Sequence, residues 1–194
     1  RGGSSTNRIE AREVCKAIIE HARKNPAESL GVAAFSIKQQ KLILDELELL
    51  RRECPDTESF FASHPTEPFF VKNLENVQGD ERDVIFISVG YGRDKNGYMA
   101  MNFGPLSNEG GERRLNVLIS RAKKQCVVFS SITADDIDLQ RVTGRGVKAF
   151  KVFLNFAKTG RLDIARETGR EEDSPFEEAV RQAIESQGYE VHPQ

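Results

Sequence analysis

Short apolar runs constrain the fold of this chain most, because they lack the alternation of apolar and polar residues that marks a half-exposed strand. The runs are LGVAAF, DVIFISVGY and QCVVFSS, and FFVKNL is a fourth strand-like stretch. Strands of a parallel sheet are covered on both faces and are therefore apolar throughout. Segments with helical periodicity separate the runs. The pattern predicts an α/β fold with a mostly parallel sheet flanked by helices.

Start and stop signals place the helices. Asn7 is a good N-cap residue, and Glu10 stands at N3 in an arrangement like a capping box. A second helix is expected from about residue 37 to 52, and VKAFKVFLNFAKTG is an amphipathic helix with Gly160 as its expected stop. The apolar residues on the buried sides of the first two helices are predicted to be Ala11, Val14, Ile18, Ala22, Leu44 and Leu47.

Composition restricts the class of function. The chain has 28 Lys and Arg against 30 Asp and Glu, a net charge of −2. A free-standing nucleic-acid binder usually has a basic excess, so any such contact must be local or shared with another domain. No apolar run is long enough to span a bilayer. The three cysteines are widely spaced and form no metal-ligand pattern, which favours a reduced, cytoplasmic setting without a metal site.

A further helix, expected from about residue 111 to 123, carries Arg114 and Arg121 beside its apolar stripe. At about 100° per residue, the two arginines lie within roughly 20° of each other at one edge of that stripe. Such positions bury the aliphatic stem and leave the guanidinium at an interface. The pair then forms ordinary salt bridges with acidic neighbours, or it binds a phosphate, for which the planar guanidinium is well suited.

Four motifs resemble those of one protein family. ERRLNVLISRAKKQCVVF is similar to motif VI of superfamily 1 helicases of the Upf1-like and Dna2-like kind, and VKNLENVQGDERDVIFISVGYG is similar to motif V. SLGVAAFSIKQQKLI resembles motif IV, and TNRIEAREV resembles the opening of the second RecA-like domain. The motifs stand in family order. The resemblance implies a RecA-like fold of the P-loop NTPase type and the second motor lobe of an ATP-dependent helicase.

The resemblance also implies an ATP site that this lobe shares with the first RecA-like lobe of the same protein. Arg121 would be the arginine finger that stabilises charge on the γ-phosphate, and Arg114 would contact phosphate or brace the motif V loop. Glu81 would bind the ATP ribose, with Gly79 in the same ATP-binding turn. Gln39 occupies the glutamine position of motif IV, and the resemblance implies that it too binds ATP. If the resemblance is set aside, Glu81 is an ordinary residue of an exposed turn, and Gln39 is a solvated helix residue.

ATP and Mg²⁺ are the cofactors that the resemblance implies for the full-length protein. The chain has no G-x-x-x-x-G-K-[ST] sequence, so it should be inactive alone. Single-stranded nucleic acid, with DNA favoured, is the implied partner. Its contacts would come from Asn73, Lys72 and Gln78, although many relatives have Ser or Thr in place of Asn73. No membrane partner is expected.

Both ends of the chain look cut, so we expect a piece of a longer protein. Residues 1–160 would form the RecA-like lobe, 161–173 a charged linker, and 174–194 the start of another domain. SPFEEAVRQAIESQGYEVHPQ resembles the opening of a Vsr-like PD-(D/E)xK endonuclease domain. The resemblance implies that Glu177 or Glu178 assists its site; alternatively, Glu177 only caps its helix.

Two other functions compete with the motor. In one, the helicase motifs act as a nucleotide-sensing scaffold that regulates an attached nuclease, without unwinding. An intact phosphate loop and an Asp-Glu pair elsewhere in the protein would favour the motor instead. In the other, the chain is a Rossmann-like small-molecule enzyme, but the absence of G-x-G-x-x-G argues against it.

Overall fold

The computed structural model describes residues 6–142 and 144–161. The predicted linker, residues 161–173, is described only at Arg161, and the predicted domain start at 174–194, with Glu177 and Glu178, lies outside the described residues. The described chain divides into two compact units. The first contains residues up to 100 together with Arg121–Ser131, and the second contains Met101–Ser120 and the residues from Ile132 onward.

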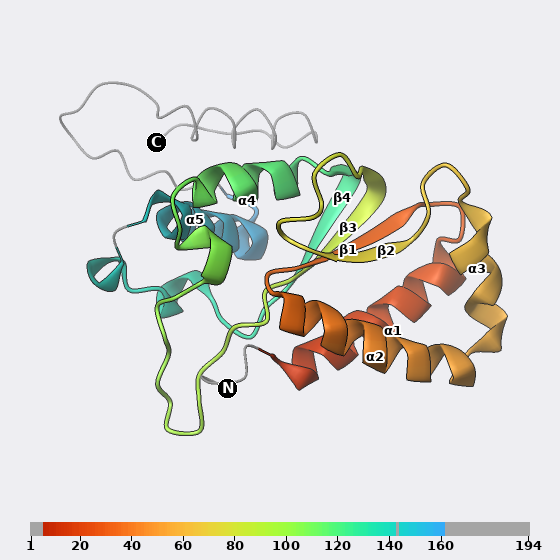
Figure 1. Ribbon diagram of the computed structural model, residues 1–194, viewed down its shortest axis with the longest axis horizontal. Coiled ribbons are helices and arrows are strands. Elements are labelled where there is room, and N and C mark those ends of the chain that lie inside the picture. The colour runs from red at the N-terminus through yellow and green to blue at the C-terminus, as the bar shows by residue number, and fades with distance from the viewer. Residues whose placement is uncertain (1–5, 143, 162–194) are drawn as a thin grey trace. The chain divides into compact units, whose positions relative to one another are not determined.

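The first unit is a parallel sheet of four strands with helices on one face (Figure 1). The spatial order of the strands is β2-β1-β3-β4, and every neighbouring pair is parallel. In chain order the elements of this unit are α1 (Arg8–Lys24), β1 (Leu30–Ala34), α2 (Ile37–Glu53), the 3-10 turn η1 (Pro55–Thr57), α3 (Glu58–Ser63), β2 (Phe70–Asn73), β3 (Arg82–Ser88) and β4 (Ala122–Phe129). The α/β prediction with a parallel sheet is confirmed, and η1 and α3 are additions to it.

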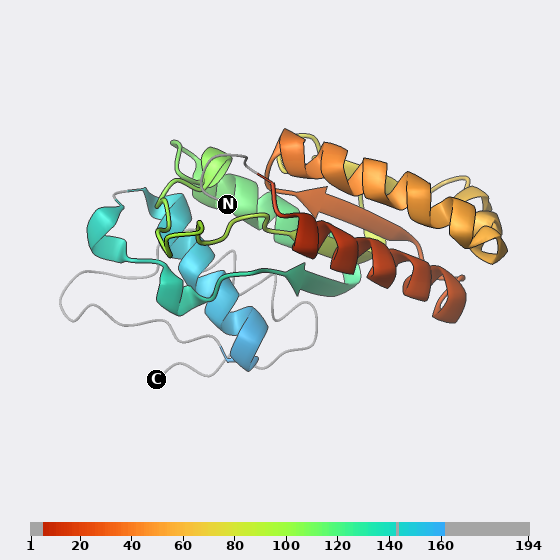
Figure 2. The same ribbon diagram turned by 90° about the horizontal axis from the view of Figure 1, so that it is seen from below.

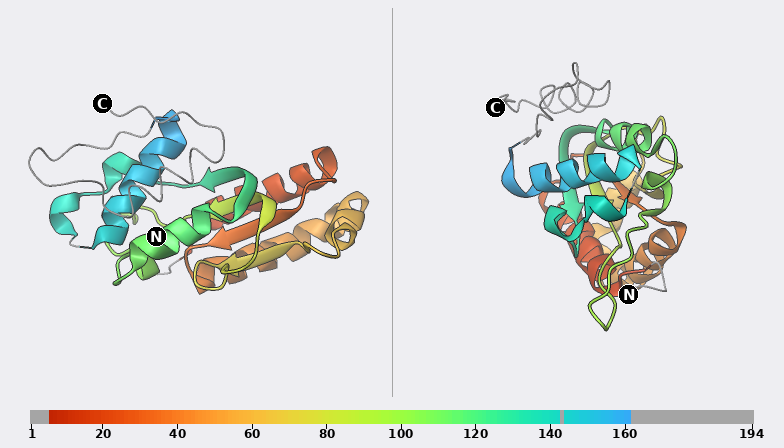
Figure 3. Two further views of the ribbon diagram at one scale, coloured as in Figure 1. Left: turned by 90° about the horizontal axis from the view of Figure 1, so that it is seen from above. Right: turned by 90° about the vertical axis from the view of Figure 1, so that its left-hand side faces the viewer.

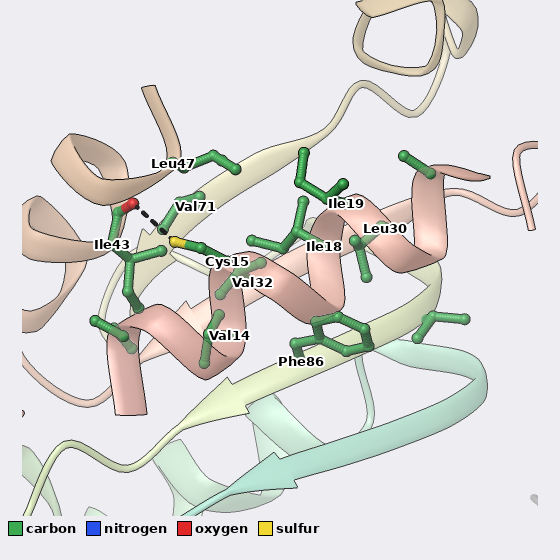
Figure 4. Close-up of a cluster of buried hydrophobic side chains, with 14 of the residues drawn as sticks. Val14, Cys15, Ile18, Ile19, Leu30, Val32, Ile43, Leu47, Val71 and Phe86 are labelled. Atoms are coloured by element: carbon green, nitrogen blue, oxygen red, sulfur yellow. Dashed lines mark hydrogen bonds between the residues drawn. The ribbon is translucent and has the colours of Figure 1, made fainter. Parts of the chain in front are cut away.

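Two long helices pack side by side against the sheet, as Figure 2 shows for α1 and α2. All four predicted core residues of α1 are buried. In α2 the prediction holds for Leu47 but is wrong for Leu44, which is 42% exposed. Figure 4 shows the core that the two helices share with β1, β2 and β3, where the Cys15 thiol donates to the backbone oxygen of Ile43 at 3.4 Å.

The second unit is built around two helices that lie against each other (Figure 3). They are α4 (Gly111–Ile119) and α5 (Arg145–Thr159), accompanied by the 3-10 turns η2 (Gly104–Leu106), η3 (Ala134–Asp136) and η4 (Leu139–Arg141). As predicted, α5 ends at Gly160, which adopts a left-handed conformation with φ +69° and donates its N–H to the backbone oxygen of Phe156.

The helix expected from residue 111 to 123 is wrong in its last four residues, because α4 ends at Ile119. Ser120 closes it with a backbone N–H bond to Asn116, and its hydroxyl donates to the backbone oxygen of Val117. The backbone oxygen of Arg121 then accepts the N–H of Arg82, which starts strand pairing. Arg121 therefore precedes a strand and does not lie on the helix that carries Arg114.

Candidate functional site

Glu81 and Arg121, which stand far apart in the sequence, meet at the amino ends of β3 and β4. The two strands pair with Arg82 opposite Ala122, so the residues just before them are neighbours. The guanidinium Nη1 of Arg121 lies 3.5 Å from the Glu81 carboxylate. The Arg121 side chain is 19% exposed and that of Glu81 is 52% exposed. The structure thus brings the expected arginine finger and the expected ribose ligand together.

Solvent reaches this pair mainly from the carboxylate side. The Glu81 side chain is half-exposed, so water screens the ion pair at 3.5 Å and the pair contributes little to stability. A phosphate oxygen could replace the carboxylate on Arg121, and sugar hydroxyls could donate to Glu81.

The loop before Glu81 is open around its glycine. Gly79 has φ +86°, and no atom lies within 4 Å of where its Cβ would stand. Asp80 closes a turn through its N–H to the backbone oxygen of Val77. Gln78 is exposed beside them. These residues form an open turn that leads directly into β3.

A buried arginine anchors the start of β3 behind this turn. Arg82 is 5% exposed, and its guanidinium donates to the backbone oxygen of Pro68 from Nε at 2.9 Å and from Nη2 at 2.6 Å. The same guanidinium stacks over the Phe70 ring at 4.7 Å. Burial lowers the pKa of Arg82, the reverse of what its acidic neighbours Asp80 and Glu67 do. Because the Arg82 side chain is held in place, the backbone at the start of β3 is fixed, and with it the position of Glu81 just before the strand.

Two of the three residues expected to contact nucleic acid, Lys72 and Asn73, have partners within the first unit. The Lys72 ammonium pairs with Asp80 at 2.6 Å. Asn73 is buried; its Oδ1 accepts the N–H of Glu75 at 3.0 Å, and its Nδ2 donates to Gln40 at 3.4 Å. Of the three, Gln78 is the exposed one. Their role in nucleic-acid binding stays a prediction.

Gln39 lies in the interior, at the carboxyl end of the sheet. It is fully buried, so the alternative of a solvated helix residue is wrong. Its Oε1 accepts the Asn7 N–H at 2.7 Å, and its Nε2 donates to the Asn7 backbone oxygen and to the Ser88 hydroxyl, both at 3.2 Å. These bonds tie the start of α2 to the start of α1 and to the end of β3. Its predicted contact with ATP stays a prediction.

Glu10 belongs to the same buried group. As predicted, the Asn7 side chain caps α1 by accepting the Glu10 N–H at 3.1 Å. The Glu10 carboxylate turns inward and accepts from the Ser88 hydroxyl and from the Gly90 N–H, each at 2.7 Å. Burial raises the pKa of Glu10 to about 7, although the hydrogen bonds from Ser88 and Gly90 oppose the rise. The capping pattern identified Glu10 but gave no sign of these distant partners.

Arg114 belongs to the second unit, where it braces the segment before its own helix. Its Nη1 donates to the backbone oxygen of Glu109 at 2.8 Å and to that of Pro105 at 3.4 Å. The two arginines of the motif therefore differ in setting: Arg121 faces a carboxylate and Arg114 faces backbone carbonyls. The phosphate role of Arg114 stays a prediction.

The structure also shows a polar cluster that the sequence did not single out. The Asp83 carboxylate accepts from the Ser29 N–H at 3.0 Å and from its hydroxyl at 3.2 Å, and it pairs with Lys124 at 3.2 Å. Glu67 bonds both Ser29 and Lys123. Asp83 lies within the stretch that resembles motif V, and here it joins the amino ends of β1, β3 and β4.

Within residues 6–142 and 144–161, no group of three or more His, Cys, Asp or Glu side chains is arranged to hold a metal ion. None of the helices in those residues has the length and apolar character required to cross a bilayer.

Comparison with known proteins identifies a family and two relatives. Residues 1–133 match the model of a family described as an AAA domain. Two curated relatives are each 36% identical over 160 residues: an uncharacterized ATP-dependent helicase of Mycoplasma genitalium and its homologue in Mycoplasma pneumoniae. The match covers 80% of this chain and 14% of each relative, so the chain spans about one seventh of their length.

Proposed function

Because the chain belongs to the AAA domain family, we propose that it is the second motor lobe of an ATP-dependent helicase or translocase. In this proposal the lobe completes an ATP site whose phosphate loop lies on a first RecA-like lobe of the same protein, and the motor acts on single-stranded nucleic acid, with DNA favoured. The names of the two relatives support ATP-dependent helicase activity in general. The contact between Glu81 and Arg121 carries the assignment of the site.

Arg121 supplies the positive charge that ATP hydrolysis requires. Negative charge develops on the transferred phosphoryl group, and a guanidinium held beside it stabilises the transition state more than the ground state. The setting of Arg121 supports this role, since its backbone is fixed by pairing with Arg82 and its side chain is only 19% exposed. Glu81 accepts hydrogen bonds from the ribose, and Gly79 leaves room for the nucleotide.

In this proposal the described residues contact two parts of the nucleotide, the ribose and the γ-phosphate. The chain has no G-x-x-x-x-G-K-[ST] sequence to cradle the other phosphates. The proposal therefore assigns the phosphate loop to the first lobe, and only the second wall of the site to this chain.

Nucleic-acid contact in this proposal runs through the segment that ends β2 and the turn after it. Lys72 gives up its ion pair with Asp80 and pairs with a phosphate of the nucleic acid. Gln78 contacts the same nucleic-acid strand from its exposed position. Asn73 shapes this segment through its bond to the Glu75 N–H. Such backbone contacts carry no sequence information.

The test is Arg121→Ala in the full-length protein. ATP turnover should fall by at least about 10³, the low end for a lost arginine finger. Arg121→Lys should restore little, because an ammonium cannot reproduce the planar guanidinium. Apparent ATP affinity should fall less than turnover, because the interaction develops in the transition state. The measurements are phosphate release and nucleotide binding on the same preparations.

Arg52→Ala is the matched control, since Arg52 is an exposed arginine on α2 that pairs with Glu48 four residues away. It should leave ATP turnover unchanged. If Arg121 has only a structural role, Arg121→Ala should instead lower the melting temperature and leave ATP turnover per folded molecule intact. If turnover of Arg121→Ala stays within a few-fold of wild type, Arg121 is not the finger.

A further inference from the structure

A loop of the first unit leaves the carboxyl end of β3 and extends away from the sheet (Figure 1, yellow-green, residues 90–100). Three contacts hold the start of this loop, at Val89 and Gly90, in place. The Val89 N–H donates to the backbone oxygen of Phe129 at 3.0 Å, and the Gly90 N–H donates to buried Glu10 at 2.7 Å. Gly90 has φ +73° and lies against Gln39, whose side chain is 3.2 Å from where a Cβ would stand.

The tip of the loop is organised around one carboxylate. Asp94 accepts the backbone N–H of Asn96 at 2.9 Å and that of Tyr98 at 2.8 Å. The Asp94 N–H donates to the Tyr98 backbone oxygen at 2.8 Å, and the Gly97 N–H donates to the Asp94 backbone oxygen at 3.1 Å. The Arg93 guanidinium donates to the Gly97 oxygen at 3.0 Å. These bonds hold the backbone from 93 to 98 in one turn.

This turn presents an aromatic ring and two cations to solvent. Tyr98 is 56% exposed. Arg93 and Lys95 are exposed on the same turn, while the Asp94 carboxylate is occupied with backbone N–H groups. A single exposed tyrosine is ordinary. An exposed tyrosine on a pre-ordered turn that also carries two exposed cations is typical of a surface on which a base stacks and phosphates are neutralised.

We propose that this turn, Arg93 to Tyr98, contacts single-stranded nucleic acid, with Tyr98 stacked on a base and Arg93 and Lys95 beside phosphates. The proposal rests on the motor function proposed above and adds a contact that the helicase motifs do not supply. Because the backbone bonds already hold the turn, little conformational entropy is lost on binding. Stacking on an aromatic side chain tolerates any base, as a translocating motor requires.

The experiment uses the full-length protein and a fluorescent oligothymidylate of about 20 nucleotides. Tyr98→Ala should weaken binding by about 5- to 150-fold, the range for one stacked base. Tyr98→Phe should bind like the wild type, because it keeps the ring. The double variant Arg93→Ala, Lys95→Ala should reduce the slope of log affinity against log salt by about 0.7 for each phosphate that it no longer neutralises.

Leu49→Ala is the control, because Leu49 is 59% exposed on α2 of the same unit. It should leave binding unchanged, and melting temperatures should show that all variants are folded. ATP turnover without nucleic acid should be the same in wild type and Tyr98→Ala. If it falls in Tyr98→Ala, the ring docks on another part of the protein and the proposal is overturned.

The outcomes separate this proposal from the motor function. A wild type that neither hydrolyses ATP nor binds the oligonucleotide overturns both. A wild type that does both, with Tyr98→Ala binding equally well, overturns only the contact at the loop. Equal losses in Tyr98→Phe and Tyr98→Ala exclude stacking and overturn it as well.

Discussion

Glu10 shows how one buried side chain links several elements. Its carboxylate joins the first turn of α1 to the end of β3 and to the root of the 90–100 loop. A charged carboxylate in this place loses its hydration, and the hydrogen bonds that it accepts compensate for only part of that loss. The pKa of about 7 follows from this balance. The group therefore changes its protonation near neutral pH, unlike an ordinary glutamate.

The stability of the fold should consequently depend on Glu10 between about pH 5 and pH 7. The unfolded chain loses this proton near the ordinary pKa of 4.5, whereas the folded chain keeps it up to about 7. The folded state binds more protons in that window, so the free energy of unfolding falls as pH rises through it. Glu10→Gln removes this dependence, and its stability relative to wild type should rise by up to about 3 kcal/mol from about pH 5 to about pH 8.

Urea unfolding of the two proteins at a series of pH values measures this difference. Glu13→Gln serves as the control, because Glu13 lies on the same helix at an exposed position beside Lys16. Its stability should follow the wild type across the range. Parallel curves for Glu10→Gln and wild type would show that the buried carboxylate does not control the pH dependence.

At the scale of elements, the second unit depends on two glycines where its helices approach. A Cβ at Gly146 of α5 would lie 2.3 Å from the backbone oxygen of Leu106 and 2.8 Å from the backbone of Gly111. A Cβ at Gly111 of α4 would likewise lie 2.3 Å from the Leu106 oxygen. These neighbours are backbone atoms and cannot move aside as a flexible side chain would. Only glycine allows α4, α5 and η2 to pack this closely.

Gly146→Ala should therefore destabilise the second unit, by at least the roughly 1–3 kcal/mol that is typical of an extra methyl in a packed core. Helix propensity alone predicts the opposite, since alanine favours a helix by about 1 kcal/mol over glycine. Lys148→Ala, at an exposed position of the same helix, is the control and should change stability little. Hydrogen exchange of α4 and α5 reports the effect; slower exchange in Gly146→Ala would contradict the close packing.

At the scale of the whole molecule, the proposal makes this chain half of a catalytic site. The sequence contains no phosphate loop, and Arg121 can act only on a phosphate held by other residues. We therefore expect the 194-residue chain alone to release no phosphate from ATP above background, with or without single-stranded DNA. The full-length protein under the same conditions is the control. Turnover that copurifies with the isolated chain would contradict the half-site model.

The sequence alone determined most of the elements, because the signals for them are local. Asn7 caps α1 through the next turn of the same helix, and Gly160 ends α5 through its own positive φ. The uninterrupted apolar character of β1 predicted its full burial, which the structure confirms. The family resemblance implied that Glu81 and Arg121 belong to one ATP site; the structure shows that the two side chains lie 3.5 Å apart, and their contact with ATP stays a prediction. Such features depend on residues within a few positions or on a recognisable motif, so a pattern can reveal them.

The tertiary structure decided the features that depend on distant partners. Periodicity extended the arginine helix to residue 123, but strand pairing with Arg82 takes Arg121 out of it. Gln39 and Glu10 have polar side chains that a pattern assigns to solvent or to a cap. They are buried because the Ser88 hydroxyl accepts a hydrogen bond from Gln39, 49 residues away, and donates one to Glu10, 78 residues away. A buried polar group is stable only when such partners are in place, and only the folded chain brings them together.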